Sequence, residues 1–424
     1  MRYSLCNHWE FTEQWSDAFC RGEPVGCRPV RLPHTCRELP LHYADPSDYE
    51  MVCGYRRTLT VPDAPRVFLR FDGAAHQAEI YLNGQLAGQH QGGYTGFTIE
   101  ITDLVHRGTE NLLAVRLDTR EDTALPPFGF VIDYLTYGGL YREVWLETTA
   151  ATCVTDLFVH TPTLTEAAVS VTTDAPEKAA VLRVSLCAPD GAALVGQQLP
   201  AAAKAECTLT LPDAQPWGTD HPNLYTCRAE LLDAAGQVLD CRETTFGFRT
   251  AEFKADGFYL NGKKTFLRGL NRHQSYPYIG YAAPESLQRN DARILKNELH
   301  CNAVRTSHYP QSQHFLDECD KLGLLVFTEL PGWQHIGDAA WKDRACEMLR
   351  EMIMQNRSHP SIILWGVRIN ESVDDDEFYN RTNKIAHELD PSRATSGVRY
   401  LEKSHLLEDV YACLLYTSPS PRDA

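Results

Sequence analysis

The sequence lacks any long hydrophobic run. In its 424 residues no stretch approaches the roughly 18 consecutive apolar residues that a membrane-spanning helix needs, so we expect no membrane partner. The opening residues MRYSLCNHWEF mix charged and aromatic side chains, where a secretory signal would have a continuous apolar segment. These two absences predict a soluble protein that resides in the cytoplasm.

Basic residues are also scarce. The chain has 40 Lys and Arg residues against 56 Asp and Glu residues, which gives a formal net charge of −16. Such an excess of negative charge repels the phosphates of a nucleic acid, so we expect no nucleic-acid partner. The composition, with 43% hydrophobic and 23% charged residues, is that of an ordinary globular protein and excludes a disordered or fibrous chain.

The fourteen cysteines include no CxxC pair, which excludes a zinc knuckle and a redox motif. We expect most of them to be small buried side chains in a reducing compartment. Their even number also fits a set of disulfides, so that alternative stays open.

Alternating apolar and polar residues fill the first part of the chain, between residues 55 and 147. This period of two, interrupted by turns, predicts an all-β sandwich. The segment AEIYLNGQLAG (78–88) contains Asn83-Gly84, the dipeptide typical of a type I′ hairpin turn, because both positions tolerate a positive φ. We expect a jelly-roll domain over residues 1–148.

A second set of alternating segments predicts an immunoglobulin-like β-sandwich over residues 149–249. Its clearest strands are expected at 156–161, 180–188, 205–211 and 225–232. We expect Trp217 and Tyr225 to pack in its core.

After Arg249 the pattern changes to strands that alternate with amphipathic helices. We expect strands at 265–271, 302–307, 324–330 and 362–371, with a fifth at 394–398. The helices are expected at about 284–299, 311–322, 340–357 and 376–389. Near-continuous apolar strands between helices predict a parallel sheet of the (β/α) barrel type, whose chemistry lies at the carboxyl ends of the strands.

Polar side chains gather at the ends of these strands, where a purely structural account expects turn residues. They are Asn271-Arg272-His273, Arg305 to Tyr309, Glu329 and Asn370-Glu371. Each alone fits a solvated loop or a structural hydrogen bond, but four successive strand ends favour a shared site. A carboxyl group beside an Asn, with His and Arg opposite, suits general acid catalysis on a polyhydroxylated substrate. Glu371 is the candidate acid/base, because burial or a neighbouring negative charge would keep it protonated.

Two long segments carry a family resemblance. NAVRTSHYPQSQHFLDECDKLGLLVF (302–327) and NRSHPSIILWGVRINES (356–372) resemble the signature stretches of glycoside hydrolase family 2, which includes β-galactosidases, β-glucuronidases and β-mannosidases. FGFRT (246–250) is similar to the family's domain junction. The resemblance implies a multidomain chain, β plus α/β, with a jelly-roll sugar-binding domain, an immunoglobulin-like β-sandwich and a (β/α)8 TIM barrel. It also implies a carbohydrate substrate, and homo-oligomers are common in the family.

The resemblance also implies roles for individual residues. It places the family's acid/base at Glu371, the Asn that binds the sugar 2-hydroxyl at Asn370, and the His that supports the transition state at His308. His273 matches another site histidine. Asp133, in DYLTYGGLYR, resembles an acidic residue that the first domain sends into the catalytic pocket, with a turn or cap residue as the alternative.

Four further residues are candidates for this site, and for three of them, Arg305, Glu329 and Trp365, two interpretations stay open. Arg305 either braces the catalytic carboxylates or makes a structural ion pair. Glu329 either tunes Glu371 or pairs with Arg305. Trp333 and Trp365 both suit stacking on a pyranose, but Trp365 lies in a predicted strand, which favours the core.

The sequence departs from the family in its barrel. The family's nucleophilic Glu belongs to the seventh barrel strand, whereas about five strands are predicted here, and no Glu in a matching context follows Ser372. We therefore expect an incomplete barrel over residues 250–412 that lacks its second catalytic carboxylate, and an inactive fragment. CLLYTSPSPRDA (413–424) resembles translated sequencing-adapter read-through, so we expect a non-native tail.

No cofactor is expected. Large microbial β-galactosidases often hold magnesium through an acidic-x-His stretch after the third strand, and ELPGWQH (329–335) does not match it.

The predicted activity is hydrolysis of terminal β-D-galactosides by a retaining double displacement. NRHQ (271–274) favours this over β-glucuronidase, the first alternative, whose corresponding stretch commonly reads NKHE. A non-catalytic carbohydrate-binding or scaffold protein is the alternative of another class. It predicts sugar binding without turnover, and the polar strand ends argue against it.

Overall fold

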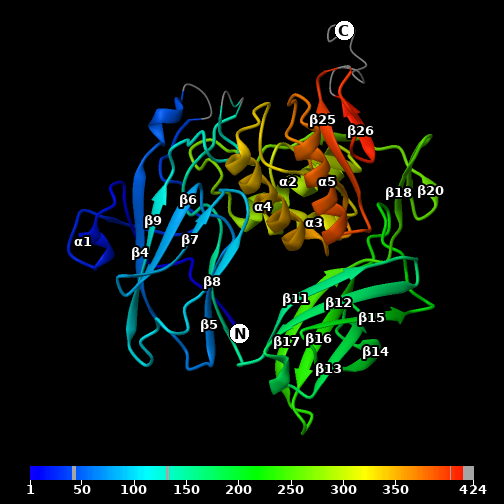
Figure 1. Cartoon of the computed structure of the whole chain (residues 1–424), viewed down its shortest axis with the longest axis horizontal. Coiled ribbons are helices and arrows are strands. Elements are labelled where there is room, and N and C mark those ends of the chain that lie inside the picture. The colour runs from blue at the N-terminus through cyan, green and yellow to red at the C-terminus, as the bar shows by residue number, and fades with distance from the viewer. Residues whose placement is uncertain (41–43, 130–131, 133, 402, 414–424) are drawn as a thin grey trace.

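The computed structural model describes residues 1–40, 44–129, 132, 134–401 and 403–413. Asp133, one of the predicted site residues, lies outside them. Figure 1 shows two all-β regions and a third region whose helices lie beside the first and above the second. No helix within the described ranges is both long and apolar enough to cross a membrane. Eleven of the fourteen cysteines are buried, which confirms the expectation for most of them.

The first region is a sandwich of two antiparallel sheets. One sheet has the order β1 (Arg2–Ser4), β10 (Val144–Thr149), β5 (Arg66–Phe71), β8 (Phe97–Glu100). The other has the order β3 (Arg28–Val30), β2 (Trp9–Thr12), β4 (Val52–Thr60), β9 (Glu110–Asp118), β6 (Gln77–Leu82), β7 (Gln85–Gln91). Two short helices, α1 (Asp17–Cys20) and η1 (Pro46–Asp48), lie in its connections. Asn83 and Gly84 join β6 to β7 with φ of 54° and 79°, as the predicted turn requires.

The second region is a smaller sandwich. Its sheets have the orders β11 (Cys153–His160), β12 (Glu166–Asp174), β15 (Lys204–Thr210) and β14 (Ala193–Pro200), β13 (Val181–Cys187), β16 (Tyr225–Leu232), β17 (Val238–Phe246). A short helix, η2 (Pro176–Lys178), precedes β13. Tyr225 packs in its core as predicted. The prediction for Trp217 is wrong. Its side chain packs with Phe258 and with Leu325 of a barrel strand, and its Nε1 donates to the Asp320 carbonyl at 2.8 Å.

A three-stranded hairpin sheet, which the sequence did not predict, links this sandwich to the barrel. It consists of β18 (Ala251–Lys254), β19 (Gly257–Leu260) and β20 (Lys263–Lys264). At the junction Arg249 is buried, and it donates to the Pro360 and Ile362 carbonyls at 2.6 Å each. Burial lowers the pKa of Arg249 to about 9, with a smaller contribution from Arg393. These hydrogen bonds fix the sandwich to the start of a barrel strand.

The third region is an incomplete (β/α)8 barrel. Its six parallel strands pair in sequence order: β21 (Gly269–Asn271), β22 (Ala303–Thr306), β23 (Leu325–Glu329), β24 (Ile362–Gly366), β25 (Ala394–Arg399), β26 (Val410–Cys413). The connecting helices are α2 (Glu285–Arg293), the π-helix η3 (Ile294–Glu298), α3 (Gln313–Leu322), α4 (Ala339–Asn356) and α5 (Asp376–Leu389). Parallel pairing in sequence order is the arrangement that successive β/α units produce.

Three barrel predictions need correction. The sequence predicted five strands and missed β26, because VYAC is too short and too polar in its surroundings to show a strand pattern. The strand expected over 265–271 is regular only at Gly269–Asn271. The strand expected over 362–371 ends at Gly366, and Glu371 adopts a left-handed backbone conformation with φ of +53°.

The first sandwich packs against the barrel helices and against the carboxyl ends of its strands. Tyr94 of the sandwich stacks on Tyr309, which follows β22, with ring centroids 4.5 Å apart. Arg142 is buried and donates to the Pro310 carbonyl at 2.8 Å. Tyr134 lies with its ring centroid 5.3 Å from that of His273. This packing brings the first domain to the barrel mouth.

Candidate active site

Four of the predicted residues form one hydrogen-bonded group, which we call the carboxyl-end network: Arg305, Glu329, Asn370 and His308. The Arg305 Nε and Nη2 atoms lie 2.5 and 3.0 Å from the two Glu329 oxygens. Arg305 Nη2 also donates to Asn370 Oδ1 at 2.6 Å. His308 Nδ1 lies 3.1 Å from Arg305 Nη2 and 3.3 Å from Glu329 Oε2. The network therefore joins the ends of three successive strands.

The strand order explains this convergence. Arg305 lies in β22, Glu329 is the last residue of β23, and Asn370 follows β24. Because the carboxyl ends of neighbouring parallel strands meet at one edge, side chains at these positions lie close together. Arg305 and Glu329 are each other's direct ion-pair partners, which is one of the two interpretations open for each residue.

Burial makes this network electrostatically strong. The Glu329 side chain is 4% exposed and the Arg305 side chain 12%. Burial alone raises the pKa of the Glu329 carboxyl, but the Arg305 charge and the hydrogen bond with His308 outweigh it and lower this pKa. Glu329 is therefore held as a carboxylate, and it fixes the orientation of Arg305 and of the His308 ring.

The ring of His273 packs beside the carboxyl-end network. Its ring lies edge-on to His308 with centroids 5.4 Å apart, and its Nδ1 is 3.0 Å from the Tyr309 hydroxyl. Burial raises the pKa of Tyr309, so its phenol remains a neutral donor. The structure thus brings both predicted histidines to one wall of the mouth.

Glu371 follows Asn370 in a left-handed backbone conformation, with φ of +53°. Its N–H donates to the Val398 carbonyl at 2.8 Å, which attaches it to β25. Its side chain is partly buried, and Gln334 Nε2 lies 3.5 Å from Glu371 Oε2. A non-glycine residue in this conformation is held by its surroundings and is common at functional sites.

The loop after β23 supports this turn. Trp333 forms an isolated parallel bridge with Asn370, and the Gln334 N–H donates to the Asn370 carbonyl at 2.8 Å. Trp333 is half-buried. Gln334 was missed by the sequence reasoning, although its position between Trp333 and His335 in the segment after strand three was a signal. Trp365, by contrast, is fully buried and donates to Asp390 Oδ2 at 2.9 Å, which makes it a core residue.

A second buried charge cluster, also missed, lies after β25. Arg399 and Glu408 are fully buried and form an ion pair. Arg368 Nη1 lies 3.8 Å from Glu408 Oε1, and its guanidinium stacks over the Tyr379 ring at 4.3 Å. The only signal was an Arg at the end of a predicted apolar strand.

One group of side chains among the described residues is close enough to share a metal ion: Asp317, Asp320 and His359, whose ligand atoms lie within 4.8 Å of one another. Asp320 and His359 are already occupied. Asp320 Oδ1 accepts from the Ser361 N–H at 3.0 Å and Asp320 Oδ2 lies 2.5 Å from His359 Nδ1. This group lies on α3 and before β24, on the amino-terminal side of the strands, so it has no part in the mouth.

Family models match the three regions in turn. The model for the sugar binding domain of glycosyl hydrolases family 2 matches residues 32–150, the model described as glycosyl hydrolases family 2 matches 152–249, and that family's TIM barrel domain matches 251–418.

Relatives of known name match across these boundaries. A β-galactosidase of Thermoanaerobacterium thermosulfurigenes is 44% identical over 96% of this chain and 59% of its own length. One from Thermoanaerobacter pseudethanolicus is 44% identical over 90% of this chain and 53% of its own length. Among solved structures, β-glucuronidase 3 of Bacteroides uniformis has a TM-score of 0.87 at 30% identity, covering 97% of this chain and 57% of that one. The chain thus spans somewhat more than half the length of these relatives.

Proposed function

Because the chain belongs to glycosyl hydrolase family 2, we propose that the whole protein is a glycoside hydrolase that cleaves terminal β-D-galactosides with retention of configuration. The similarity to two β-galactosidases, at 44% identity over at least 90% of this chain, supports the galactoside. The observation that carries the chemistry is the buried carboxyl-end network directly beside Glu371. We also propose a cytoplasmic location, which the free state of the cysteines from Cys6 to Cys346 supports.

In the proposed reaction Glu371 is the general acid/base. Its carboxyl group gives a proton to the glycosidic oxygen as the bond to the anomeric carbon breaks, so the aglycone leaves as a neutral alcohol. A second carboxylate attacks the anomeric carbon and forms a glycosyl-enzyme ester. The Glu371 carboxylate then removes a proton from a water molecule, whose oxygen attacks the same carbon and releases the sugar.

The neighbouring residues orient the sugar in this proposal. Asn370, held by Arg305 at 2.6 Å, binds the 2-hydroxyl, and His308 and His273 contact the ring hydroxyls. Trp333 offers its half-buried ring face to the apolar side of the pyranose. We propose for Asp133 the role of an acidic sugar contact from the first domain, which its sequence neighbour Tyr134 supports through its ring contacts with His273.

The nucleophile is the missing part of this mechanism. A retaining enzyme needs a second carboxyl roughly 5 Å from the acid/base. Among the described residues, the two buried carboxylates at the strand ends are unsuited to it: Glu329 binds Arg305 and His308, and Glu408 binds Arg399. The proposed reaction therefore takes its nucleophile from a residue that these six strands do not supply, and we propose that residues 1–424 alone are inactive.

β-Glucuronidase is the second candidate within the class. Two solved structures support it, with TM-scores of 0.87 and 0.85 for the Bacteroides uniformis and Parabacteroides merdae β-glucuronidases. Their sequence identities, 30% and 28%, are lower than those of the two β-galactosidases. Galactoside therefore remains the first proposal.

Chromogenic substrates test the proposal. The whole protein is assayed with p-nitrophenyl β-D-galactopyranoside and with p-nitrophenyl β-D-glucuronide, alongside its Glu371→Gln variant. Faster hydrolysis of the galactoside, lost in the variant, is the expected result. Faster hydrolysis of the glucuronide would replace the substrate, and sugar binding without hydrolysis of either would favour a carbohydrate-binding protein.

A further inference from the structure

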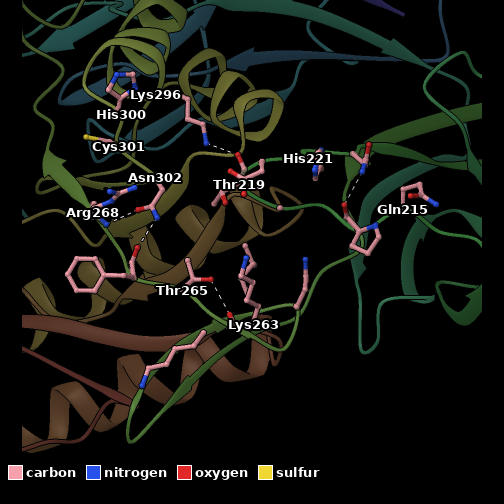
Figure 2. Close-up of a pocket in the computed structure, with 18 residues that line it drawn as sticks. Gln215, Thr219, His221, Lys263, Thr265, Arg268, Lys296, His300, Cys301 and Asn302 are labelled. Atoms are coloured by element: carbon pink, nitrogen blue, oxygen red, sulfur yellow. Dashed lines mark hydrogen bonds between the residues drawn. The ribbon is translucent and has the colours of Figure 1, made fainter.

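A large cavity lies on the opposite side of the barrel from the candidate active site. Its volume is about 1120 Å³, and it is formed by the segment 215–223 of the second sandwich, the hairpin segment 260–266 and the segment 296–302. Arg268 precedes β21 and Asn302 precedes β22, so the cavity lies at the amino ends of the strands. Figure 2 shows Lys296, Arg268 and Lys263 coming from different segments around it.

The lining of this cavity is predominantly basic, whereas the chain as a whole is acidic. Four basic side chains line it, Lys263, Lys264, Arg268 and Lys296, whereas Asp220 is the single acidic residue of its lining. The chain as a whole has a net charge of −16. We call this feature the cationic cavity. A local excess of positive charge on an acidic protein creates a field that attracts anions to that place alone.

Three of the four basic side chains have no ion pair with any carboxylate of the described residues: Lys263, Arg268 and Lys296. Lys264 pairs with Asp256 at 3.0 Å. Most basic residues elsewhere in the chain do have such partners, so this clustering of unpaired cations is a local property of the cavity.

Two backbone carbonyls, rather than a carboxylate, hold the ammonium group of Lys296. Its Nζ donates to the Thr219 carbonyl at 2.7 Å and to the Gly323 carbonyl at 3.1 Å, as the dashed line to Thr219 in Figure 2 shows in part. An ammonium group has three N–H donors, so two carbonyls leave one donor for a further acceptor. Burial lowers the pKa of Lys296, and Asp220 partly offsets it, so an added anion would stabilise its charged form.

The other lining groups fit an elongated ligand. Asn302 is held rigidly, because its Oδ1 accepts from the Arg268 N–H at 2.7 Å and its Nδ2 donates to the Phe266 carbonyl at 2.8 Å. This contact fixes the backbone from which the Arg268 guanidinium extends. Phe266 is 81% exposed and offers an apolar face at the edge of the cavity. The volume of about 1120 Å³ exceeds the roughly 300–1,000 Å³ of most small-ligand sites, which suits an oligosaccharide or a similarly large anion.

We propose that the cationic cavity is a binding site for a multivalent oxyanion, a ligand with two or more phosphate, sulfate or carboxylate groups, held by Lys263, Arg268 and Lys296. Arg268 supplies a bidentate fork for one oxyanion, and the two ammonium groups bind others. The site is separate from the proposed hydrolysis, since it lies at the other end of the strands, and its test is independent of activity.

Isothermal titration calorimetry of the full chain tests this with three probes. Pyrophosphate represents phosphate compounds, a heparin-derived tetrasaccharide represents sulfated sugars, and maltotetraose is the uncharged sugar control. We expect at least one anionic probe to bind, to bind more weakly as the ionic strength rises, and maltotetraose not to bind. The stronger of the two anionic probes identifies the source of the ligand.

Variants locate the binding. Arg268→Gln and Lys296→Gln are each expected to weaken it about tenfold, because each removes a charge-assisted hydrogen bond. Lys178→Gln is the matched control, since Lys178 is an exposed lysine of the second sandwich outside the cavity, and it should change nothing. Urea unfolding of each variant verifies that it is folded, and Arg268 is exposed, so its removal leaves the fold intact.

Two results would overturn the proposal. One is the absence of binding of both anionic probes at millimolar concentration. The other is equal weakening by Lys178→Gln and by the cavity variants, which would reduce the binding to adventitious association of anions with surface lysines.

Discussion

The two ends of the parallel sheet differ in how their positive charges are neutralised. At the carboxyl end, Arg305 is 12% exposed and binds Glu329, and Arg399 is fully buried and binds Glu408. At the amino end, Lys263 and Arg268 are exposed, and within the described ranges no carboxylate pairs with Arg268. Arg305 and Arg399 are thus buried charges with protein partners, whereas Lys263 and Arg268 are exposed charges without a carboxylate partner among the described residues.

The difference follows from burial. A buried charge without a partner is strongly destabilising, so the charges of the carboxyl-end network must be paired with one another even when no substrate is bound. Such internal pairing fixes Asn370 and His308 in position, which is what a preorganised site requires. An exposed cation has no such requirement, and it is free to bind a ligand. Variants at both ends test this contrast.

The largest expected effect on stability is at Arg305. Arg305→Leu leaves Glu329 as a buried carboxylate without its partner, so we expect the free energy of unfolding to fall by about 3–5 kcal/mol. Urea denaturation followed by far-UV circular dichroism measures it. The double variant Arg305→Leu/Glu329→Leu removes both charges and should regain most of the loss. A loss below about 1 kcal/mol in the single variant would mean that solvent screens the charges of the network, as it does for an exposed ion pair.

Glu371 tests the carboxyl end of the sheet through the rate of hydrolysis rather than through stability. In the whole protein, Glu371→Gln should slow hydrolysis of p-nitrophenyl β-D-galactopyranoside by at least ~100-fold, the usual scale for general acid–base catalysis. Because Glu371 is only partly buried and its one described side-chain contact is a long one to Gln334, the free energy of unfolding should change little. Near-normal activity in this variant would remove Glu371 from the acid/base role.

Much of this site was predictable because it depends on local patterns. A short apolar strand followed by polar residues marks a strand end, and this rule predicts from the sequence that Arg305, Glu329 and Asn370 lie close together. The Asn83-Gly84 turn was predictable for the same reason, since the φ values it needs are a property of the two residues themselves.

Contacts between distant segments were not predictable. Gln334 approaches Glu371 because two loops align through the Trp333–Asn370 bridge, and no single-segment pattern encodes that alignment. Trp217 was assigned to the wrong core because its apolar character does not say which domain will cover it. Buried charges such as Arg399 look exposed in a hydrophobicity pattern. The domain boundaries and the role of Asp133 remain predictions.

His359 sharpens the comparison, because it is a largely buried cation on the amino-terminal side that does have a carboxylate partner. Its Nδ1 lies 2.5 Å from Asp320 Oδ2, and its Nε2 is 3.1 Å from Gln313 Oε1. Burial lowers the pKa of His359, but the charge and hydrogen bond of Asp320 outweigh burial, so this pKa is raised overall. Stability from this pair is therefore complete below the pKa of an unfolded histidine and is lost as the pH rises through the higher folded pKa.

His359→Gln is the test of that pH dependence. At pH 6 the variant should lose about 1–3 kcal/mol of unfolding free energy, the range for a hydrogen bond to a charged group, and at pH 9 it should lose less. Urea denaturation at several pH values provides the curve, with His106→Gln, which changes a histidine far from Asp320 in the first sandwich, as the control. A loss that grows with pH would reverse the assigned direction.

The smallest expected effect is at the cationic cavity. Lys263 is exposed and pairs with no carboxylate in the part of the chain that the structure describes, so its charge contributes almost nothing to folding. Lys263→Gln should change the free energy of unfolding by less than about 0.5 kcal/mol, the usual range for a surface substitution away from special features. Comparison with Arg305→Leu under the same conditions gives the contrast directly. A loss above 1 kcal/mol, on the order of a charged hydrogen bond, would show that Lys263 has a structural partner and would remove it from the group of cations available to a ligand.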